Sequence, residues 1–277
     1  MRNLDIKLDN YPLIYRSKLS IPSYINFGLE LELDKVDSSE VRNLVSRNIG
    51  GDFSVKNDKS LTTGMNAEIN TPVLRNSKAT WELLKKMGEL LKKINASYDR
   101  CSFQVNFDGS LLPSVEDRVR FLKLYAMYED IIYRFSLGED DEFRDSIETY
   151  AYPIIWMMKS IKGHGNDSIV DMFSRHKRYG ICFKTKNCDL IEFRTPNMTD
   201  NICLWQNYVT FFYYLLMASS SGKINMREVD EYISNYSRIY ILENYEKEKE
   251  EKALQLSKKL FCNSTDRINF MHQYLGK

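Results

Sequence analysis

The chain has 277 residues, of which 43% are hydrophobic and 28% charged, so it is long enough to bury the core of one large globular domain. Its 39 basic and 38 acidic side chains leave a net charge of +1, which argues against a strongly basic nucleic-acid-binding surface. The most apolar window, residues 208–218, is about half as long as a membrane span. We therefore expect a buried helix there, with no nucleic-acid or membrane partner.

The N-terminus and the cysteines favour a cytoplasmic protein. Residues 1–5 lack the apolar segment of a signal peptide. The five cysteines are odd in number and form no CxxC pair, which suits reduced thiols. None of the three histidines lies at zinc-ligand spacing from a cysteine pair, so we expect any bound metal to have oxygen ligands.

In chain order, alternating apolar and polar residues predict strands at 27–33, 66–70, 101–108 and 189–194, the last in a hairpin with a strand at 179–184. Leucine spacing and capping residues predict helices after Asp37, over 77–94, from Ser114 to about 135, and from Pro196–Asp200 to about 220. Because the order is no regular βαβ alternation, we expect an α+β fold with a mostly antiparallel sheet over residues 1–222. Residues 223–277 read as a helical C-terminal extension.

The polar sides of these strands carry groups that bind cations or phosphate. In residues 27–33, Glu30 and Glu32 share one face about 6.5 Å apart, close enough to repel unless water or a metal ion compensates. The other strands place further polar residues in the same alternating pattern: Glu68, Gln104, Asn106, Glu192 and Arg194. If the strands share one sheet, one of its faces is an acidic, amide-lined floor with a single arginine.

Six short stretches carry a resemblance to a known family: FGLELE at 27–32, DKSL at 58–61, EINTP at 68–72, CSFQVN at 101–106, YAYP at 150–153 and IEFR at 191–194. In this order and approximate spacing, they resemble the amidoligases, relatives of glutamine synthetase and of glutamate–cysteine ligase. The resemblance covers roughly residues 25–220. It implies a glutamine-synthetase-like catalytic sheet that binds ATP and two magnesium ions. The implied reaction joins a carboxylate to an amine, each from a small molecule or a peptide, through an acyl phosphate.

The resemblance also implies roles for individual residues. Asp58 would orient or deprotonate the attacking amine, Arg194 would face the transferred phosphoryl group, and Arg144 would bind a substrate carboxylate or phosphate. The implied metal ligands are Glu30, Glu32, Glu68, Gln104 and Glu192, and the implied ATP contacts are Gln104, Asn106, Glu192 and Arg194. General chemistry agrees, because magnesium prefers oxygen ligands and the planar fork of arginine suits phosphate.

The sequence departs from the family pattern at two places. The family usually carries His-x-His where this chain has Gln104 and Asn106, and a glycine where it has Lys59. An amide oxygen can still bind magnesium. The loss of both imidazoles also fits a protein that binds a nucleotide, amino acid or peptide without turnover. A third hypothesis is hydrolysis of a phosphate ester on the same acidic floor.

Simpler interpretations stay open for single residues. The acidic face is also what a solvent-facing side of an antiparallel sheet looks like, and Glu192 and Arg194 suit a structural ion pair. Asp58 is also typical of a turn, and Arg144 lies in an acidic loop that offers salt-bridge partners. His164, between two glycines, reads as an ordinary loop histidine. The helical tail is where we expect contacts with a second copy of the chain or another protein.

Overall fold

A sheet of seven antiparallel strands organises the part of the chain that the computed structural model describes, namely residues 12–58, 61, 64–161, 163–185, 188–237 and 249–276. The strand order is β2-β3-β1-β5-β7-β6, and β4 pairs with one end of β1. The strands are β1 (Asn26–Asp34), β2 (Ser54–Lys56), β3 (Asn66–Asn70), β4 (Leu74–Arg75), β5 (Phe103–Asp108), β6 (Ile181–Lys184) and β7 (Leu190–Phe193). The expected α+β class, antiparallel sheet and hairpin are confirmed. Residues 186 and 187, between the two strands of this hairpin, lie outside the described residues.

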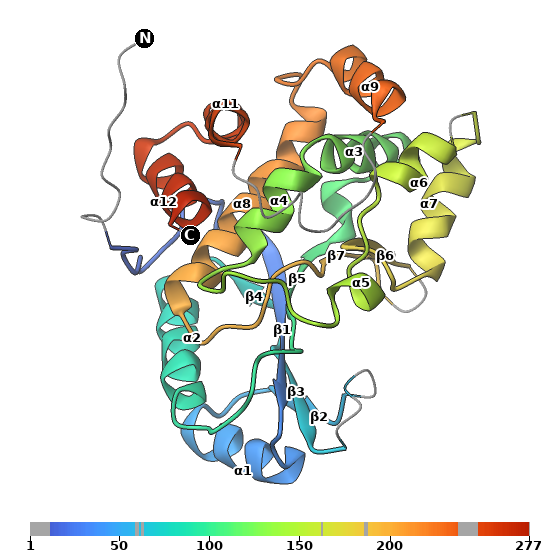
Figure 1. Ribbon diagram of the computed structural model, residues 1–277. Coiled ribbons are helices and arrows are strands. Elements are labelled where there is room, and N and C mark those ends of the chain that lie inside the picture. Colours follow the sequence, from blue (N-terminus) through green and yellow to red (C-terminus); the bar gives the residue numbers. More distant parts are fainter. Residues whose placement is uncertain are drawn as a thin grey trace.

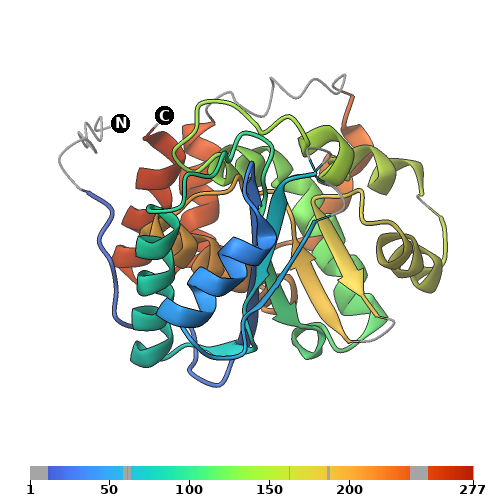
Figure 2. The same cartoon turned by 90° about the horizontal axis from the view of Figure 1, so that it is seen from below.

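Helices surround the sheet (Figures 1 and 2). Those before β6 are α1 (Ser38–Asn48), α2 (Lys78–Leu91), the 3-10 turn η2 (Gly109–Leu111), α3 (Val115–Met127), α4 (Glu129–Ser136), α5 (Ile147–Tyr150), α6 (Ile155–Ser160) and α7 (Asn166–Arg175). Those after β7 are α8 (Ile202–Ser220), α9 (Met226–Asn235), α11 (Glu250–Leu260) and α12 (Ser264–Leu275).

The apolar face of the sheet packs on α2 and α8. Trp81 of α2 stacks on Phe27 of β1, with ring centroids 5.7 Å apart. From α8, Phe212 stacks on Phe193 of β7 at 4.2 Å, and Trp205 stacks on Phe103. This packing buries one face of the central strands and leaves the alternate side chains of β1, β5 and β7 on the other face.

The helix that we expected from Ser114 to about 135 is two helices in the structure. Ser114 makes the predicted capping box with Asp117, but Tyr128 leaves helical geometry (φ −106°, ψ 15°) and separates α3 from α4. The turn allows both oxygens of the buried Glu129 carboxylate to accept from the backbone N–H groups of Ile154 and Ile155. The start of α8 also differs from expectation, because its N-cap is Asn201, beyond the Pro196–Asp200 segment.

The apolar window 208–218 lies in α8, which is largely buried, as expected. Among the described helices, none combines the length and the apolar character that crossing a bilayer requires. Helix α9 packs on α3 and α6, whereas α11 and α12 pack on α8 (Figure 1). All three contribute side chains to the same hydrophobic core as the sheet: Val229, Ile233, Ala253, Leu256, Leu260 and Phe270. The domain boundary at residue 222 stays a prediction.

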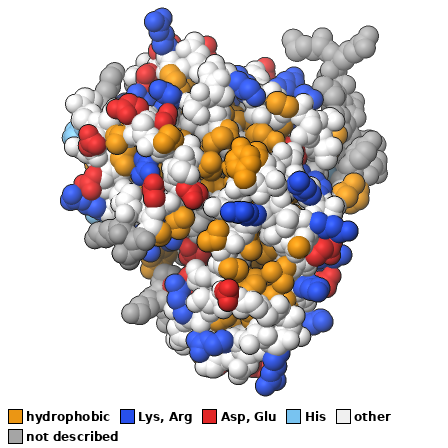
Figure 3. All heavy atoms as spheres, turned by 180° about the vertical axis from the view of Figure 1, so that it is seen from behind, with side chains coloured by type: hydrophobic (Ala, Val, Ile, Leu, Met, Phe, Trp, Pro, Cys, Tyr) orange, Lys and Arg blue, Asp and Glu red, His pale blue; other side chains and the backbone are white. Residues whose placement is uncertain are grey.

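Basic side chains do not gather in one region of the described surface seen from behind (Figure 3). They are spread around a central group of apolar side chains and are mixed with acidic ones. The near-neutral composition of the whole chain is therefore visible on this face as well.

Candidate functional site

The strand register gathers the predicted acidic residues on one face of the sheet. Glu32 of β1 lies directly opposite Glu68 of β3, and Glu30 lies opposite Gln104 of β5. On the other side of β5, Asn106 lies opposite Glu192 of β7. Directly opposed residues have Cβ atoms about 5 Å apart. The premise that these strands share one sheet and one polar face is therefore correct.

A cavity of about 460 Å³ lies on this face. Its acidic lining comes from the sheet and from the turn after β2: Glu30, Glu32, Asp58, Glu68 and Glu192. Its basic lining comes from β2 and β6, from the residue after β7, and from the end of α7 with the segment that follows it: Lys56, Lys184, Arg194, Arg175, Lys177 and Arg178. We call it the sheet cavity. Opposite charges on the floor and the wall suit a ligand that itself carries both signs of charge.

Lys184 of β6 joins the two acids at the centre of the cavity. Its Nζ atom lies 2.8 Å from Oε1 of Glu30 and also forms an ion pair with Glu192, whose side chain is fully buried. Burial alone would lower the pKa of Lys184, but the attraction of Glu192 and Glu30 outweighs it and raises this pKa. The lysine is therefore held as an ammonium between two carboxylates.

Arg194 has partners on three sides. Its Nε donates to the carbonyl of Tyr150 at 3.0 Å, and its Nη1 donates to Oε1 of Gln104 at 3.1 Å. The same Nη1 lies 3.1 Å from Oε2 of Glu192. Although burial raises the pKa of the Glu192 carboxyl, Arg194 and Lys184 together hold it below its usual range. The Glu192–Arg194 ion pair, which was the structural alternative for these two residues, is present, and both residues line the cavity.

Glu32 is held by neutral donors. The Ser102 backbone N–H donates to it at 2.6 Å and the Gln104 side-chain amide at 2.9 Å. Burial raises the pKa of Glu32, and the hydrogen bonds from Ser102 and the charge of Arg144 only partly offset this effect. A carboxyl group with a raised pKa accepts a proton more readily near neutral pH.

Glu68 also has a raised pKa. Burial is the largest cause and the nearby charge of Glu30 adds to it, while hydrogen bonds from Asn70 and Lys56 act in the opposite direction. Asn70 donates to Glu68 at 2.7 Å, and Nζ of Lys56 lies 3.1 Å away. Positive charges therefore stabilise the carboxylates of Glu32 and Glu68 less than that of Glu192.

The structure places Asp58 at the cavity wall, where its backbone N–H donates to the side chain of Asn66 at 2.6 Å. Lys59 and Ser60, the next two residues of the expected motif, lie outside the described residues. Asn106 is buried and donates to Glu30 at 2.8 Å. Its Oδ1 atom is buried without a hydrogen-bond partner among the described residues.

Arg144 does not line the sheet cavity in the described structure. Its Nη1 donates to the carbonyls of Thr195 and Pro196 at 2.8 and 3.1 Å, and its Nη2 donates to the carbonyl of Arg194 at 2.7 Å. With its guanidinium occupied by backbone, it cannot clamp a substrate in this arrangement. We therefore assign Arg144 to positioning the segment that follows β7, which corrects our expectation of a substrate contact.

The described residues do not fit two magnesium ions. No three Asp, Glu, His or Cys side chains within the described ranges converge closely enough to hold a metal ion. Each expected ligand already has a partner: Lys184 for Glu30 and Glu192, Lys56 for Glu68, two neutral donors for Glu32, and Arg194 for the amide oxygen of Gln104. We therefore assign no step of any reaction to a metal ion.

Sequence reasoning missed several residues of this site. Cys182 and Lys184 alternate with Ile181 and Phe183 in β6, which is the same period-two pattern that identified the other strands. Cys182 lies opposite Glu192, and its thiol donates to that carboxylate at 2.8 Å. The basic wall has a visible signal too, because residues 175–178 read Arg-His-Lys-Arg.

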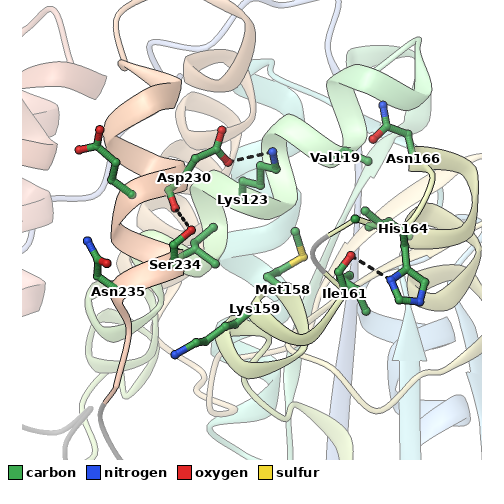
Figure 4. Close-up of a pocket in the computed structure, with 14 residues that line it drawn as sticks. Val119, Lys123, Met158, Lys159, Ile161, His164, Asn166, Asp230, Ser234 and Asn235 are labelled. Carbon is green, nitrogen blue, oxygen red and sulfur yellow. Dashed lines mark hydrogen bonds and ion pairs between the residues drawn. The ribbon is translucent and has the colours of Figure 1, made fainter.

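A second cavity of about 440 Å³ lies among α3, α6, α7 and α9 (Figure 4). Lys123 and Asp230 form an ion pair across it at 2.8 Å. His164 borders it, and a ring nitrogen of His164 lies 3.1 Å from the carbonyl oxygen of Ile161, three residues earlier in the same loop. None of the residues that we expected to be functional lines this second cavity.

Comparison with known proteins adds no relative. A scan of the sequence against known protein families found no match, and a search of curated proteins found no similar sequence.

Proposed function

We propose that the sheet cavity is the substrate site of an ATP-dependent carboxylate–amine ligase that acts through an acyl phosphate. The observation that carries the proposal is the convergence of five carboxylates and of Arg194, Lys184 and the 175–178 wall on one cavity of about 460 Å³. An amine substrate is a cation until it loses a proton, and phosphate and carboxylate are anions. A cavity with both charges can hold all three groups close together.

The reaction needs the basic and the acidic side chains of the cavity at different steps. The carboxylate substrate takes the terminal phosphoryl group of ATP, and ADP leaves. The amine nitrogen then attacks the acyl carbon, an amide bond forms, and phosphate leaves with the electrons of the broken C–O bond. Arg194 and Lys184 face the developing negative charge. A carboxylate must take the proton of the amine, and Asp58 is assigned this role, with Glu68 as a neighbour whose raised pKa suits proton transfer.

A smaller cavity of about 270 Å³ supports a second ligand beside the first. It shares Glu30 and Asn70 with the sheet cavity, and it is lined by Gly28 and Asn106. The Oδ1 atom of Asn106 is buried and has no hydrogen-bond partner among the described residues. A ligase must hold a nucleotide as well as an acid and an amine, so two adjoining cavities favour this class over one with a single substrate.

The test is to incubate the purified protein with ATP and pools of carboxylates and amines, with and without magnesium, while ADP is measured. We expect ADP release that requires both an acid and an amine. Replacing Arg194 by glutamine should lower this rate at least about 100-fold. The matched control is Arg42→Gln, because Arg42 is an exposed arginine that donates to the Val55 carbonyl, outside the sheet cavity. No amine-dependent ADP release and no ATP binding by calorimetry would contradict the proposal.

A binding protein without turnover is the second candidate. It is favoured by Lys184 and Arg194, which already satisfy carboxylates that the resemblance assigns to metal ions. In that case Glu30→Ala and Glu192→Ala should change the affinity for a nucleotide, amino acid or peptide by calorimetry, while mass spectrometry finds no covalent product with wild type. Detection of an amide product would exclude this candidate.

A further inference from the structure

The centre of the sheet cavity contains a cluster of four charged side chains among the described residues. Glu30 and Glu192 contribute two negative charges, and Lys184 and Arg194 contribute two positive ones. We infer that the ammonium group of Lys184 occupies the place of a divalent ion between Glu30 and Glu192, so that the wild-type site takes no divalent ion there. The inference concerns the site of the proposed function, but its test does not depend on turnover.

Strand pairing places Lys184 on the same face of the sheet as Glu192. Lys184 lies opposite Leu190 in the β6–β7 ladder, and two residues earlier Cys182 lies opposite Glu192. The Cys182 thiol donates to Glu192 at 2.8 Å. Glu192 is fully buried, and the side chain of Lys184 is only 20% exposed. The lysine therefore has little freedom to leave Glu192.

One oxygen of the Glu30 carboxylate already accepts from two donors. Oε1 of Glu30 accepts from Lys184 and from the amide of Asn106, each at 2.8 Å. A divalent ion arriving beside Lys184 would meet an ammonium in a partly buried site, where repulsion between like charges is weakly screened. Its binding therefore requires Lys184 to leave both carboxylates. Lysine suits this place because its ammonium is a compact charge with three donors.

A fixed cation has a consequence for the ligand. A phosphoryl or carboxylate group that enters the cavity meets Lys184 and Arg194 directly, and the positive charge does not have to be brought in by a metal ion. Binding of inorganic pyrophosphate or of ATP should then change little when magnesium is replaced by a chelator. This result would distinguish the site from one that must bind divalent ions before it binds a phosphate group.

The decisive experiment follows bound Mn²⁺ by electron paramagnetic resonance in wild type, Glu30→Gln, Lys184→Ala and the Lys184→Ala, Glu30→Gln double variant. We expect the wild-type and Glu30→Gln titrations to superimpose. Lys184→Ala should gain about one saturable site per chain, and the double variant should lose it. The matched control is Lys123→Ala, which also removes a lysine from a carboxylate, in the second cavity (Figure 4). It should gain no site.

Two results would overturn the inference. One is a saturable Mn²⁺ site in wild type that Glu30→Gln removes, and this result decides the matter even if Lys184→Ala does not fold. The other is a folded Lys184→Ala protein that gains no site. Thermal unfolding gives a second readout, since excess magnesium should raise the Tm of Lys184→Ala and leave those of wild type and Lys123→Ala unchanged. A metal-loaded wild type would leave the ligase proposal standing, whereas a protein without ligase activity leaves the metal titration unaffected.

Discussion

Two arginines close to each other in the structure have different tasks. Arg194 turns its guanidinium toward side chains of the sheet cavity, namely Gln104 and Glu192. The guanidinium of Arg144 instead donates to the backbone carbonyls of residues 194–196, which follow β7. The charge of Arg144 still lowers the pKa of Glu32, although burial raises that pKa more. The position of Arg194 at the cavity therefore depends on an arginine that does not line it.

Substitution of Arg144 should lower the stability of the protein. Replacing Arg144 by lysine keeps the charge but supplies no planar fork, so buried carbonyls lose their donors. We expect the free energy of unfolding to fall by about 3 kcal/mol, measured by urea denaturation. The matched control is Arg42→Lys, since exposed Arg42 also donates to a backbone carbonyl, and its change should stay below about 0.5 kcal/mol. Equal effects of the two changes would contradict this assignment of Arg144.

At the scale of an element, the start of β6 determines how closely the hairpin can approach the helices. The N–H of Arg194 donates to the carbonyl of Gly180 at 2.9 Å. A Cβ atom at Gly180 would lie 2.6 Å from the hydroxyl oxygen of Tyr125 and 2.7 Å from that of Tyr133. Such distances are too short for real contacts, so glycine is required here by packing.

Replacing Gly180 by alanine should therefore displace the strand that carries Lys184. We expect the free energy of unfolding to fall by about 1–3 kcal/mol, the typical range for overpacking. Gly28→Ala is the matched control, because Gly28 is also a strand glycine and its added Cβ would make ordinary contacts of 3.8 and 3.9 Å. It should leave stability unchanged or slightly higher. If both variants unfold at the same urea concentration, the protein tolerates a Cβ atom at Gly180 and the packing argument is wrong.

Much of the sheet could be predicted from the sequence, because a period of two residues assigns each side chain to a face before any partner strand is known. Glu30, Glu32, Glu68 and Glu192 were placed on one face in this way. The pattern does not specify which strands are neighbours or which residues are opposed, since these depend on contacts between distant parts of the chain. The pairing of Lys184 with Glu30, 154 residues away, depends on such distant contacts and was not predicted.

The same limit explains the correction at Arg144. Its acidic neighbours in sequence suggested a salt bridge and the family resemblance suggested a substrate contact, but its partners are carbonyls some 50 residues further along the chain. Backbone acceptors have no sequence signature. The break at Tyr128 was equally hidden, because the buried Glu129 is held by N–H groups from the start of another helix.

At the scale of the whole molecule, the last two helices are tied to the body of the fold by apolar packing and by buried charges, among them Asp130. Phe270 of α12 stacks on Phe135 of α4, with ring centroids 5.0 Å apart. Asp130 of α4 is buried, and its carboxylate lies 2.6 Å from Nζ of Lys249 and 2.7 Å from Nζ of Lys252. Two lysines at the start of α11 thus share one acceptor in α4.

This ion cluster predicts a pH dependence of stability. Burial raises the pKa of Asp130, but Lys252 and Lys249 outweigh burial and hold the pKa below its ordinary value. Because the folded state favours the charged form, the cluster stabilises the fold above the unfolded-state pKa of about 4, and this contribution disappears as the pH falls through the lower, folded-state pKa. The free energy of unfolding should therefore decrease on acidification through this range.

Replacing Asp130 by asparagine isolates this contribution, because asparagine keeps the size of the side chain and removes the charge. At pH 7 the variant should unfold with a free energy about 2 kcal/mol lower than wild type in urea denaturation. As the pH falls from about 4 through the lower, folded-state pKa, the two proteins should converge, since the wild-type carboxylate is then protonated. Asp230→Asn is the matched control, because its pair with Lys123 is more exposed and should contribute less than about 0.5 kcal/mol at any pH. A constant difference between wild type and Asp130→Asn across the pH range would mean that the two lysines do not hold α11 through this charge.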